Sequence, residues 1–199
     1  MTNQIRLLFG FRPKTLEDFI GASQSTQAEA MKYFVEKFRG DKFLRTGILW
    51  WNVRDGWPIV SDAIVDYYNS KKLAYKYIWN AQRNVCVLIN DPDVIPGSDV
   101  IPGSTGDLLP LKAVNDSRSE ASGKVKVIDI GSGKVVFKGK FKVPANGRVT
   151  IAELPVPAGQ GLLLIEYETA DGAYRNHYLY GEPPFDYPTY RNWIEKAGI

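Results

Sequence analysis

The feature that most constrains the fold is the stretch TGILWWNVRDGWP at residues 46–58. Its first half is apolar at successive positions and rich in β-forming residues, which is typical of a strand buried on both faces of a sheet. A strand of that kind needs a hydrogen-bonded neighbour along each edge. The chain therefore has to supply further strands, or leave an apolar surface that is exposed or covered by self-association.

The residues before this stretch predict two helices. Thr15 is placed to cap the first, which is short. Thr26 and Glu29 match the capping-box pattern that opens a second helix, and Gly40 stands where that helix would end. The apolar faces expected for these helices are Leu16, Phe19 and Ile20 in the first, and Met31, Phe34, Val35 and Phe38 in the second.

Two further helical segments are predicted after the stretch. Ser61 or Asp62 is placed to cap a short helix that Asn69 breaks. Before the stretch, IRLLFGF at residues 5–11 is the one further candidate strand. One doubly buried strand among helices is not a complete sheet, so this region is typical of the end of a larger α/β domain. The apolar positions expected in the two later helices are Ile64, Val65 and Tyr68, and then Leu73, Ala74, Tyr77 and Ile78.

The rest of the chain predicts an antiparallel β-sandwich. Short β-forming runs alternate with turn signals such as GSG at 131–133 and DG at 171–172. About seven such runs are typical of an immunoglobulin-like sandwich. We therefore predict an α+β fold, with a helical part at residues 1–80 and a sandwich with a C-terminal tail at 81–199. The predicted strands are 83–90, 109–115, 123–130, 133–142, 147–152, 161–169 and 173–180.

A tandem repeat separates the first two predicted strands. The hexapeptide DVIPGS occurs at 93–98 and again at 99–104. Its Pro and Gly residues exclude a central strand, and a duplication in a surface loop explains it. A calcium loop is the alternative, but the spacing of the carboxylates does not match regular ligand offsets. These carboxylates belong to Asp91, Asp93, Asp99 and Asp107.

Charge and composition argue against nucleic-acid and membrane partners. The net charge of +3 is small, and no apolar run approaches the roughly 18 residues of a membrane span. With 44% hydrophobic and 24% charged residues, the composition is that of a soluble globular protein. The lysines between 124 and 142 mostly alternate with apolar residues, which favours the wet face of a sheet over a binding patch.

The cysteine and histidine content excludes several kinds of site. Cys86 is the single cysteine, so no disulfide forms within the chain, and a core position is expected for it. His177 is the single histidine, which excludes a histidine-rich metal site and most histidine-based triads, and favours packing in the sandwich. We predict no metal and no other cofactor. We expect no signal peptide, and the compartment stays open between cytoplasm and periplasm.

Several segments together resemble a known family. TGILWWNVRDGWP and the following SDAIVDYYNSKKLAYKYI at 61–78 closely resemble the last barrel strand and last barrel helix of glycoside hydrolase family 2, the β-mannosidase and β-galactosidase group. In β-mannosidases the strand commonly reads as an aromatic residue and then W-Q-x-N-D-x-W-P. SQSTQAEAMKYFVEKFR at 23–39 resembles the helix before that strand, and NHYLYGEPPFDYPTYRNWIEK at 176–196 resembles the end of the terminal sandwich. Within 61–78 the matching positions are Ser61, Asp66, Tyr67, Lys72 and Tyr75-Lys76-Tyr77.

The resemblance implies that residues 1–80 end a (β/α)8 catalytic barrel, whose active site lies at the C-terminal ends of its strands. It implies a carbohydrate partner and places Trp51 under the sugar, where a flat ring suits the apolar face of a pyranose. Asn52, Arg54 and Asp55 are implied as polar contacts, although glutamine and asparagine are commoner in place of the first two. A surface role for Arg54 and a turn cap for Asp55 stay open as alternatives. The wider clan also implies a cis peptide bond between Trp51 and Asn52.

No residue of the chain is predicted to be catalytic. Retaining glycosidases need two carboxyl groups about 5 to 5.5 Å apart, which in this family are glutamates on barrel strands four and seven. The helical part has no Asn-Glu pair, and Leu8 stands where LLFGF faintly resembles the nucleophile segment. Glu17, Glu29 and Glu36 are expected on solvated helix faces. We therefore expect an enzyme that cleaves β-glycosidic bonds with retention, of which this chain alone is an inactive part.

Two other functions stay open at this point. The sandwich is suited to binding carbohydrate or protein if the aromatic side chains of its tail, Tyr187, Tyr190 and Trp193, are exposed together on one face. Burial of these rings against the sandwich would remove the support for that function. The other alternative is that the sandwich is a structural spacer that supports the last barrel helix.

Overall fold

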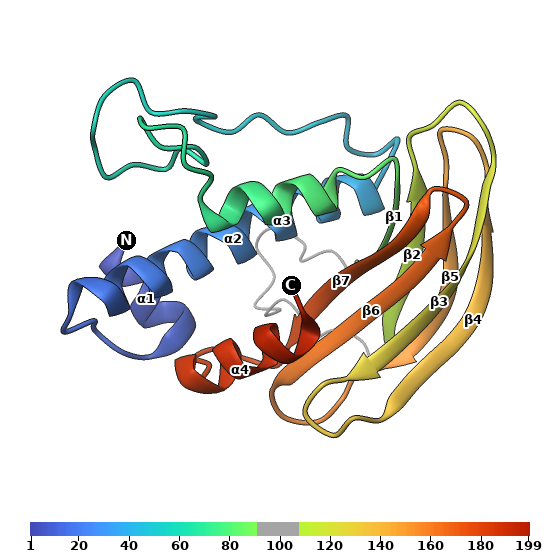
Figure 1. Cartoon of the computed structure of the whole chain (residues 1–199). Helices are drawn as coiled ribbons and strands as arrows, with labels where there is room; N and C mark the ends of the chain where they lie inside the picture. The colour runs from blue at the N-terminus through green and yellow to red at the C-terminus, as the bar shows by residue number, and fades with distance from the viewer. Residues whose placement is uncertain (91–107) are drawn as a thin grey trace. The chain divides into compact units, whose positions relative to one another are not determined.

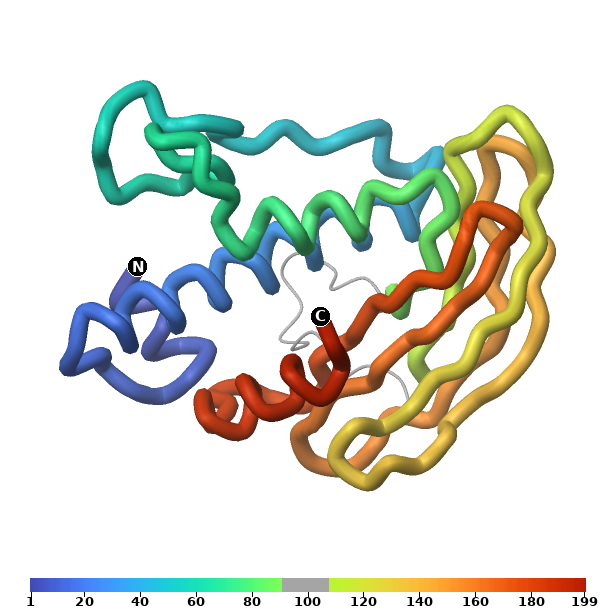
Figure 2. The backbone as a smooth tube through the Cα atoms, viewed as in Figure 1, coloured from blue at the N-terminus to red at the C-terminus, as the bar shows by residue number. Residues whose placement is uncertain are grey.

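The computed structural model describes residues 1–90 and 108–199, so the DVIPGS repeat and the four carboxylates near it lie outside the described residues. The chain divides into two compact units, Met1–Arg83 and Asn84–Ile199. Figures 1 and 2 show helices and a long connecting segment in the first unit, and strands followed by a helix in the second.

The first unit is organised by one long helix, α2 (Leu16–Gly40). The Thr15 hydroxyl caps it by accepting a hydrogen bond from the Asp18 amide at 3.1 Å. The prediction of two separate helices here is wrong. Thr26 lies inside α2 and donates its hydroxyl proton to the Ala22 carbonyl at 2.8 Å, so it bonds back to the preceding turn and does not cap a new helix.

Helix α3 (Leu73–Ala81) packs against α2. The side chains of α2 bond both ends of α3: Gln24 Oε1 accepts from the Leu73 amide at 3.0 Å, and the Arg39 guanidinium donates to the Ala81 carbonyl. These contacts satisfy backbone groups that a helix leaves without intrahelical partners, and they fix the position of α3 along α2.

Residues 5–11 do not form a strand. Residues 5–9 belong to helix α1 (Thr2–Phe9), in which Ile5 and Phe9 are buried one turn apart. Gly10 takes a left-handed conformation with φ 72°, and its N–H donates to the Arg6 carbonyl at 3.0 Å. The apolar residues therefore follow the period of a helix with a glycine cap, and the candidate strand is a misprediction.

The segment between α2 and α3 contains neither the predicted strand at 46–53 nor the predicted helix after Ser61. It forms isolated backbone bridges in their place, in which Val65 pairs with Arg54 and with Lys71. The Val65 N–H donates to the Val53 carbonyl at 2.9 Å, so it is not available to a helix. The apolar stretch at 46–53 has no neighbouring strand in this unit, and a strand without neighbours has nothing to pair with.

The second unit is an antiparallel sandwich, as predicted. Its sheets have the strand orders β1-β2-β5 and β4-β3-β6-β7, and every adjacent pair is antiparallel. The seven predicted strands are all confirmed, and the predicted α+β class with them. The observed bounds are β1 (Val85–Ile89), β2 (Leu108–Asn115), β3 (Ala121–Asp129), β4 (Val135–Val143), β5 (Arg148–Pro155), β6 (Gly161–Thr169) and β7 (Gly172–Tyr180).

Alternation along the strands separates the core from the wet face. On β3, Val125 and Val127 enter the core between the sheets, whereas Lys124 and Lys126 point outward. Lys126 lies 3.7 Å from Glu166 of the neighbouring strand, so the lysines occupy the solvated sheet face that the sequence indicated. Cys86 and His177 are both buried, also as predicted.

The C-terminal helix α4 (Tyr187–Ala197) docks on its own sandwich. Asp186 caps it by accepting from the Thr189 amide at 3.0 Å, and Trp193 packs against Leu162 and Leu164 of β6. Tyr187 and Tyr190 are buried. A binding surface made of exposed tail aromatics therefore loses its support.

Candidate functional site

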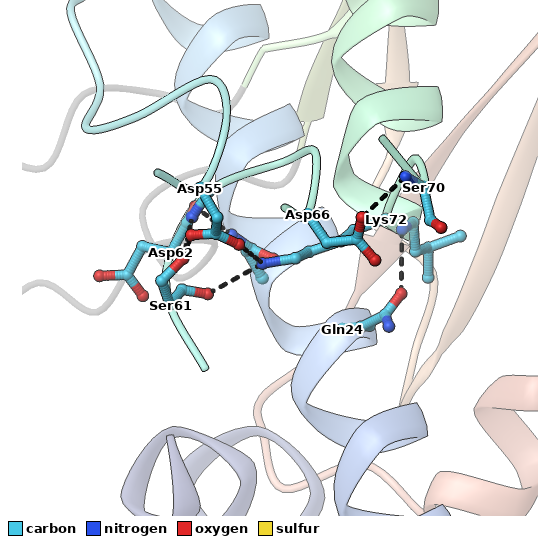
Figure 3. A network of polar contacts seen from close by, with 10 residues as sticks. Gln24, Asp55, Ser61, Asp62, Asp66, Ser70 and Lys72 are labelled. Atoms are coloured by element: carbon cyan, nitrogen blue, oxygen red, sulfur yellow. Dashed lines mark hydrogen bonds and ion pairs between the residues drawn. The ribbon is translucent and has the colours of Figure 1, made fainter. Parts of the chain in front are cut away.

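The polar centre of the first unit is the carboxylate of Asp55, drawn in Figure 3. Its side chain is 2% exposed, so it needs partners for its charge. Ser61 Oγ donates to Oδ1, and Lys72 Nζ lies 3.3 Å from Oδ2. The same ammonium donates to the Ser61 carbonyl at 3.3 Å. Asp55, Ser61 and Lys72 are thus bonded to one another in all three pairings.

These contacts favour the charged form of Asp55. The hydrogen bond from Ser61 is the main cause that lowers the pKa of Asp55. Burial acts in the opposite direction, and the hydrogen bond and positive charge of Lys72 lower the pKa further. Asp55 is therefore an ionised anchor, which does not suit the role of a general acid.

Backbone contacts around Asp55 close the segment into a compact loop. The Asp55 N–H donates to the Val65 carbonyl at 3.1 Å, and the Lys72 N–H donates to the Ile64 carbonyl at 2.9 Å. The Asp66 carboxylate accepts from the Ser70 N–H at 2.7 Å, as Figure 3 also shows. We call residues 53–72, held by these bonds, the braced loop.

The apolar residues on either side of Asp55 lie at the surface of this unit. Leu49 is 100% exposed, Trp51 is 85% exposed and Trp57 is 64% exposed. A soluble unit rarely leaves so many large apolar side chains in water next to one another along the chain. The exposed surface that the sequence led us to expect is therefore present. Its other members are Phe43, Leu44, Val53, Ile59 and Val60.

Two polar atoms within the same segment are enclosed and lack partners. Trp50 Nε1 and Asn52 Oδ1 are buried and form no hydrogen bond with any described residue. Buried polar groups in complete folds nearly always find a partner. The peptide bond between Trp51 and Asn52 is cis, which confirms the prediction made for it.

The four residues predicted to contact substrate divide into two groups. Trp51 and Arg54 are exposed and Asn52 is half-buried, whereas Asp55 faces its own loop. Arg54 donates to the Tyr67 carbonyl at 3.1 Å, which leaves its remaining N–H groups available at the surface. The sequence reasoning made Ser61 a candidate helix cap and Lys72 only a matching position of the family segment, so it placed neither beside Asp55. A prediction that the Asp55 carboxylate is buried would have indicated that it needs a cation and a hydrogen-bond donor as partners, such as Lys72 and Ser61.

The remaining carboxylates of the helical unit supply no obvious chemistry. Glu17 is exposed, as expected, but Glu36 is buried and pairs with Lys32 at 2.7 Å. The expectation of a solvated face was wrong for Glu36, because an ion pair one helical turn apart compensates both charges inside the unit. Within residues 1–90 and 108–199, no His, Cys, Asp and Glu side chains cluster as a metal site would require.

No described helix has the length and apolar character needed to span a membrane.

Comparisons with known proteins agree on one group of enzymes. A 75-residue stretch is 41% identical to Beta-mannosidase B of Aspergillus niger, and it makes up 36% of this chain and 9% of that protein. No model of a protein family matches the chain.

Solved structures match over most of the chain. The crystal structure of β-D-mannosidase from Dictyoglomus thermophilum has a TM-score of 0.74 and 24% identity over 91% of this chain and 22% of its own length. Exo-chitosanase CsxA of Amycolatopsis orientalis has a TM-score of 0.65 and 17% identity over 89% of this chain and 21% of its own length. The chain thus spans about a fifth of these enzymes, and the predicted resemblance to the β-mannosidase group is confirmed.

Proposed function

We propose that this chain is the C-terminal part of a retaining β-glycosidase of the β-mannosidase type. Residues 1–80 would complete its (β/α)8 barrel, and residues 81–199 would form its terminal immunoglobulin-like domain. The sequence likeness to a β-mannosidase and the fold shared with two glycosidases support this proposal. The strongest support is the exposed apolar segment, because its sequence suits a strand that is buried on both faces, yet its side chains are exposed here.

The site proposed for the sugar is the C-terminal end of that segment. Trp51 offers an exposed indole face on which the apolar side of a pyranose can stack. Asn52 is half-buried and Arg54 is exposed, and each offers N–H donors close to Trp51 along the chain. Asp55 supports the site without facing the sugar, because its carboxylate is bonded to Ser61 and Lys72.

The two catalytic glutamates of such an enzyme would lie outside this chain. We therefore expect the purified chain to leave p-nitrophenyl β-mannoside and p-nitrophenyl β-galactoside unhydrolysed. If hydrolysis faster than in buffer were observed, the variants Glu17→Gln, Glu29→Gln and Glu36→Gln would test whether one of these carboxylates is catalytic. A rate unchanged in all three variants would exclude them as catalytic groups. Any enzymatic rate would contradict the inactivity of the chain.

The coding sequence that precedes the codon of Met1 in the genome gives the sharper test. If the proposal is right, its translation contains an Asn-Glu pair and a later glutamate, each at the end of a predicted barrel strand. A preceding sequence that encodes an unrelated protein or no protein would overturn the proposal. This readout does not depend on whether the isolated chain folds or binds sugar.

We also propose that the chain self-associates through its exposed apolar segment. In the absence of the remaining barrel strands, two copies can cover Leu49, Trp51 and their neighbours with each other.

A further inference from the structure

The sequence pattern after residue 58 includes Ser61, Asp66 and Lys72, to which the proposed sugar site gives no role. We propose that Asp55, Ser61 and Lys72 form an electrostatic brace that holds the braced loop, residues 53–72, and thereby positions the indoles of Trp51 and Trp57. The brace is assembled from this chain alone. The effect of the brace on sugar binding rests on the proposed function, whereas its effect on the loop and on the two indoles does not.

The first argument is that the brace is complete. Each carboxylate oxygen of Asp55 has its own donor, Ser61 on Oδ1 and Lys72 on Oδ2. Lys72 also bonds the backbone carbonyl of Ser61, so removal of the Asp55 carboxylate takes an acceptor from both Ser61 and Lys72. A buried charge that loses its counter-charge is strongly unfavourable, so the three side chains are expected to act as one unit.

The second argument is that the brace joins the two ends of the loop. Asp55 lies near its beginning and Lys72 at its end, 17 residues apart in sequence. Between them, the Val65 backbone bonds both Val53 and Asp55, and Asp66 closes the turn that leads to Ser70. Side-chain and backbone bonds therefore both connect the two ends of the loop, and Figure 3 shows the side-chain contacts of Asp55, Ser61, Asp66 and Lys72.

The third argument is that the braced loop is tied to the helices of its own unit. Lys72 immediately precedes α3, and the first amide of α3, that of Leu73, bonds Gln24 of α2 at 3.0 Å. Gln27, one turn further along α2, donates to the Asp62 carbonyl at 2.6 Å. The loop thus has a rigid support that requires no other barrel strand.

The fourth argument is the position of the indoles along the chain. Trp51 precedes Asp55 by four residues and Trp57 follows it by two, so both tryptophans flank the anchored residue. Both tryptophans are largely exposed, Trp51 at 85% and Trp57 at 64%, so little of their surface packs against other side chains. The anchored backbone between them is therefore the main restraint on where they point. Asp55, Ser61 and Lys72 are positioning residues in this sense, and none of them needs to touch the sugar.

The experiment measures the loop and the indoles in the isolated chain. Amide hydrogen exchange reports the protection of Asp55, Val65 and Lys72, and fluorine NMR of fluorotryptophan-labelled chain reports the environments of Trp51 and Trp57. The variants are Asp55→Asn, Ser61→Ala and Lys72→Met. The control Asp62→Asn makes the same change from carboxylate to amide at an exposed side chain beside Ser61.

We expect Asp55→Asn to lower the protection of the loop amides by about tenfold or more, with the protection of α2 amides unchanged. The fluorine signals of Trp51 and Trp57 shift and broaden in the same variant, and Asp62→Asn changes neither readout. Ser61→Thr and Lys72→Arg retain the hydroxyl and the positive charge, so they restore both readouts, whereas Ser61→Ala and Lys72→Met do not.

Two results would overturn the brace. One is unchanged loop protection in Asp55→Asn. The other is a loss of protection that extends equally over α2 and α3 and leaves the indole signals unaltered, which indicates general stability without positioning. Because no sugar and no second barrel segment is present, failure here leaves the glycosidase proposal standing. An unrelated sequence before Met1 would in turn leave the brace standing.

Discussion

Asn176 on β7 donates from Nδ2 to the carbonyl oxygen of Val87 on β1, 2.9 Å away. Each of these strands is at the edge of its own sheet, so the bond joins the two sheets where their edges meet. The other side of the same amide is also occupied, because Oδ1 accepts from the His177 N–H at 2.8 Å. Tyr167 adds a second link to β1 through its hydroxyl, 3.3 Å from the Val85 carbonyl.

Replacement of Asn176 by alanine tests how much this inter-sheet hydrogen bond contributes to the free energy of unfolding. The change removes the Asn176 amide from the buried Val87 carbonyl and the buried His177 N–H, and we expect a loss of about 1–3 kcal/mol in the free energy of unfolding. Urea denaturation followed by far-UV circular dichroism measures it. Asn192→Ala on the exposed side of α4 is the control and should be close to neutral. Equal stability of both variants would show that the inter-sheet bond contributes nothing.

Gly123 on β3 is expected to tolerate no side chain. A Cβ atom there would overlap the carbonyl oxygen of Glu168 on the neighbouring strand and come within 2.7 Å of the Phe141 ring. Gly123→Ala should therefore destabilise the sandwich by about 1–3 kcal/mol, as overpacking commonly does. In the control Gly131→Ala the nearest atom is 3.4 Å away, an ordinary contact. Thermal unfolding of the two variants compares them directly, and a similar midpoint for both would contradict the predicted overlap.

Local patterns were sufficient to predict the sandwich. The strands are short runs of β-forming residues, β3 alternates buried and outward-facing residues at Lys124–Val127, and glycine-containing turns follow β3, β4, β5 and β6, so no distant information is required. The cores around Val125 and Val127 and the exposure of Lys124 could be predicted for that reason. The inter-sheet bond of Asn176 could not, because its partner Val87 lies 89 residues away and leaves no local pattern.

The helical unit was harder to predict because its apolar run at 46–53 finds no neighbouring strand within residues 1–83. The run at 46–53 has the composition of a buried strand, yet nothing pairs with it here, and Leu49 is left in water. Val65 was expected in a helix, but its backbone bonds Val53. The position of Trp51 at the surface follows from the resemblance, whereas the burial of Asp55 depends on Ser61 and Lys72 from later in the chain.

The pair formed by Tyr180 and Asp129 predicts a loss of stability in alkali. The hydroxyl lies 2.7 Å from Asp129 Oδ2, and burial, followed by this hydrogen bond and the negative charge, raises the pKa of Tyr180 to about 12. The unfolded chain releases this proton near pH 10. The folded state therefore holds the proton over the window from about 10 to 12, and stability falls as the pH rises through it.

The variant Tyr180→Phe isolates this effect. It lacks the titrating hydroxyl, so the difference in urea midpoint between the wild type and the variant should shrink between about pH 10 and 12. At neutral pH the variant loses one hydrogen bond, which costs about 1 kcal/mol. A difference that stays constant across the alkaline range would show that Tyr180 does not hold its proton more tightly in the folded chain.

The hydrogen bond from Ser61 predicts the acid titration of Asp55. It is the main cause that lowers the pKa of Asp55, with Lys72 acting in the same direction and burial against it. A lowered pKa in the folded state contributes stability that is present above the unfolded value of about 3.9 and is lost as the pH falls through the folded value. Carbon NMR of the Asp55 carboxyl group measures the titration. Ser61→Ala should raise the pKa toward its ordinary value, and an unchanged titration would contradict the assigned cause.

The exposed apolar segment predicts concentration-dependent association of the chain. Leu49 and Trp51 together present large side chains to water, and their burial against a second copy is favourable. Sedimentation velocity should show faster-moving species as the concentration rises, and the double variant Leu49→Ser with Trp51→Ser should raise the dissociation constant by about tenfold or more. Leu16→Ser is the matched control, since Leu16 is also exposed but lies at the start of α2. A chain that remains monomeric at every concentration, or a control that weakens association equally, would show that this segment is not the surface through which copies meet.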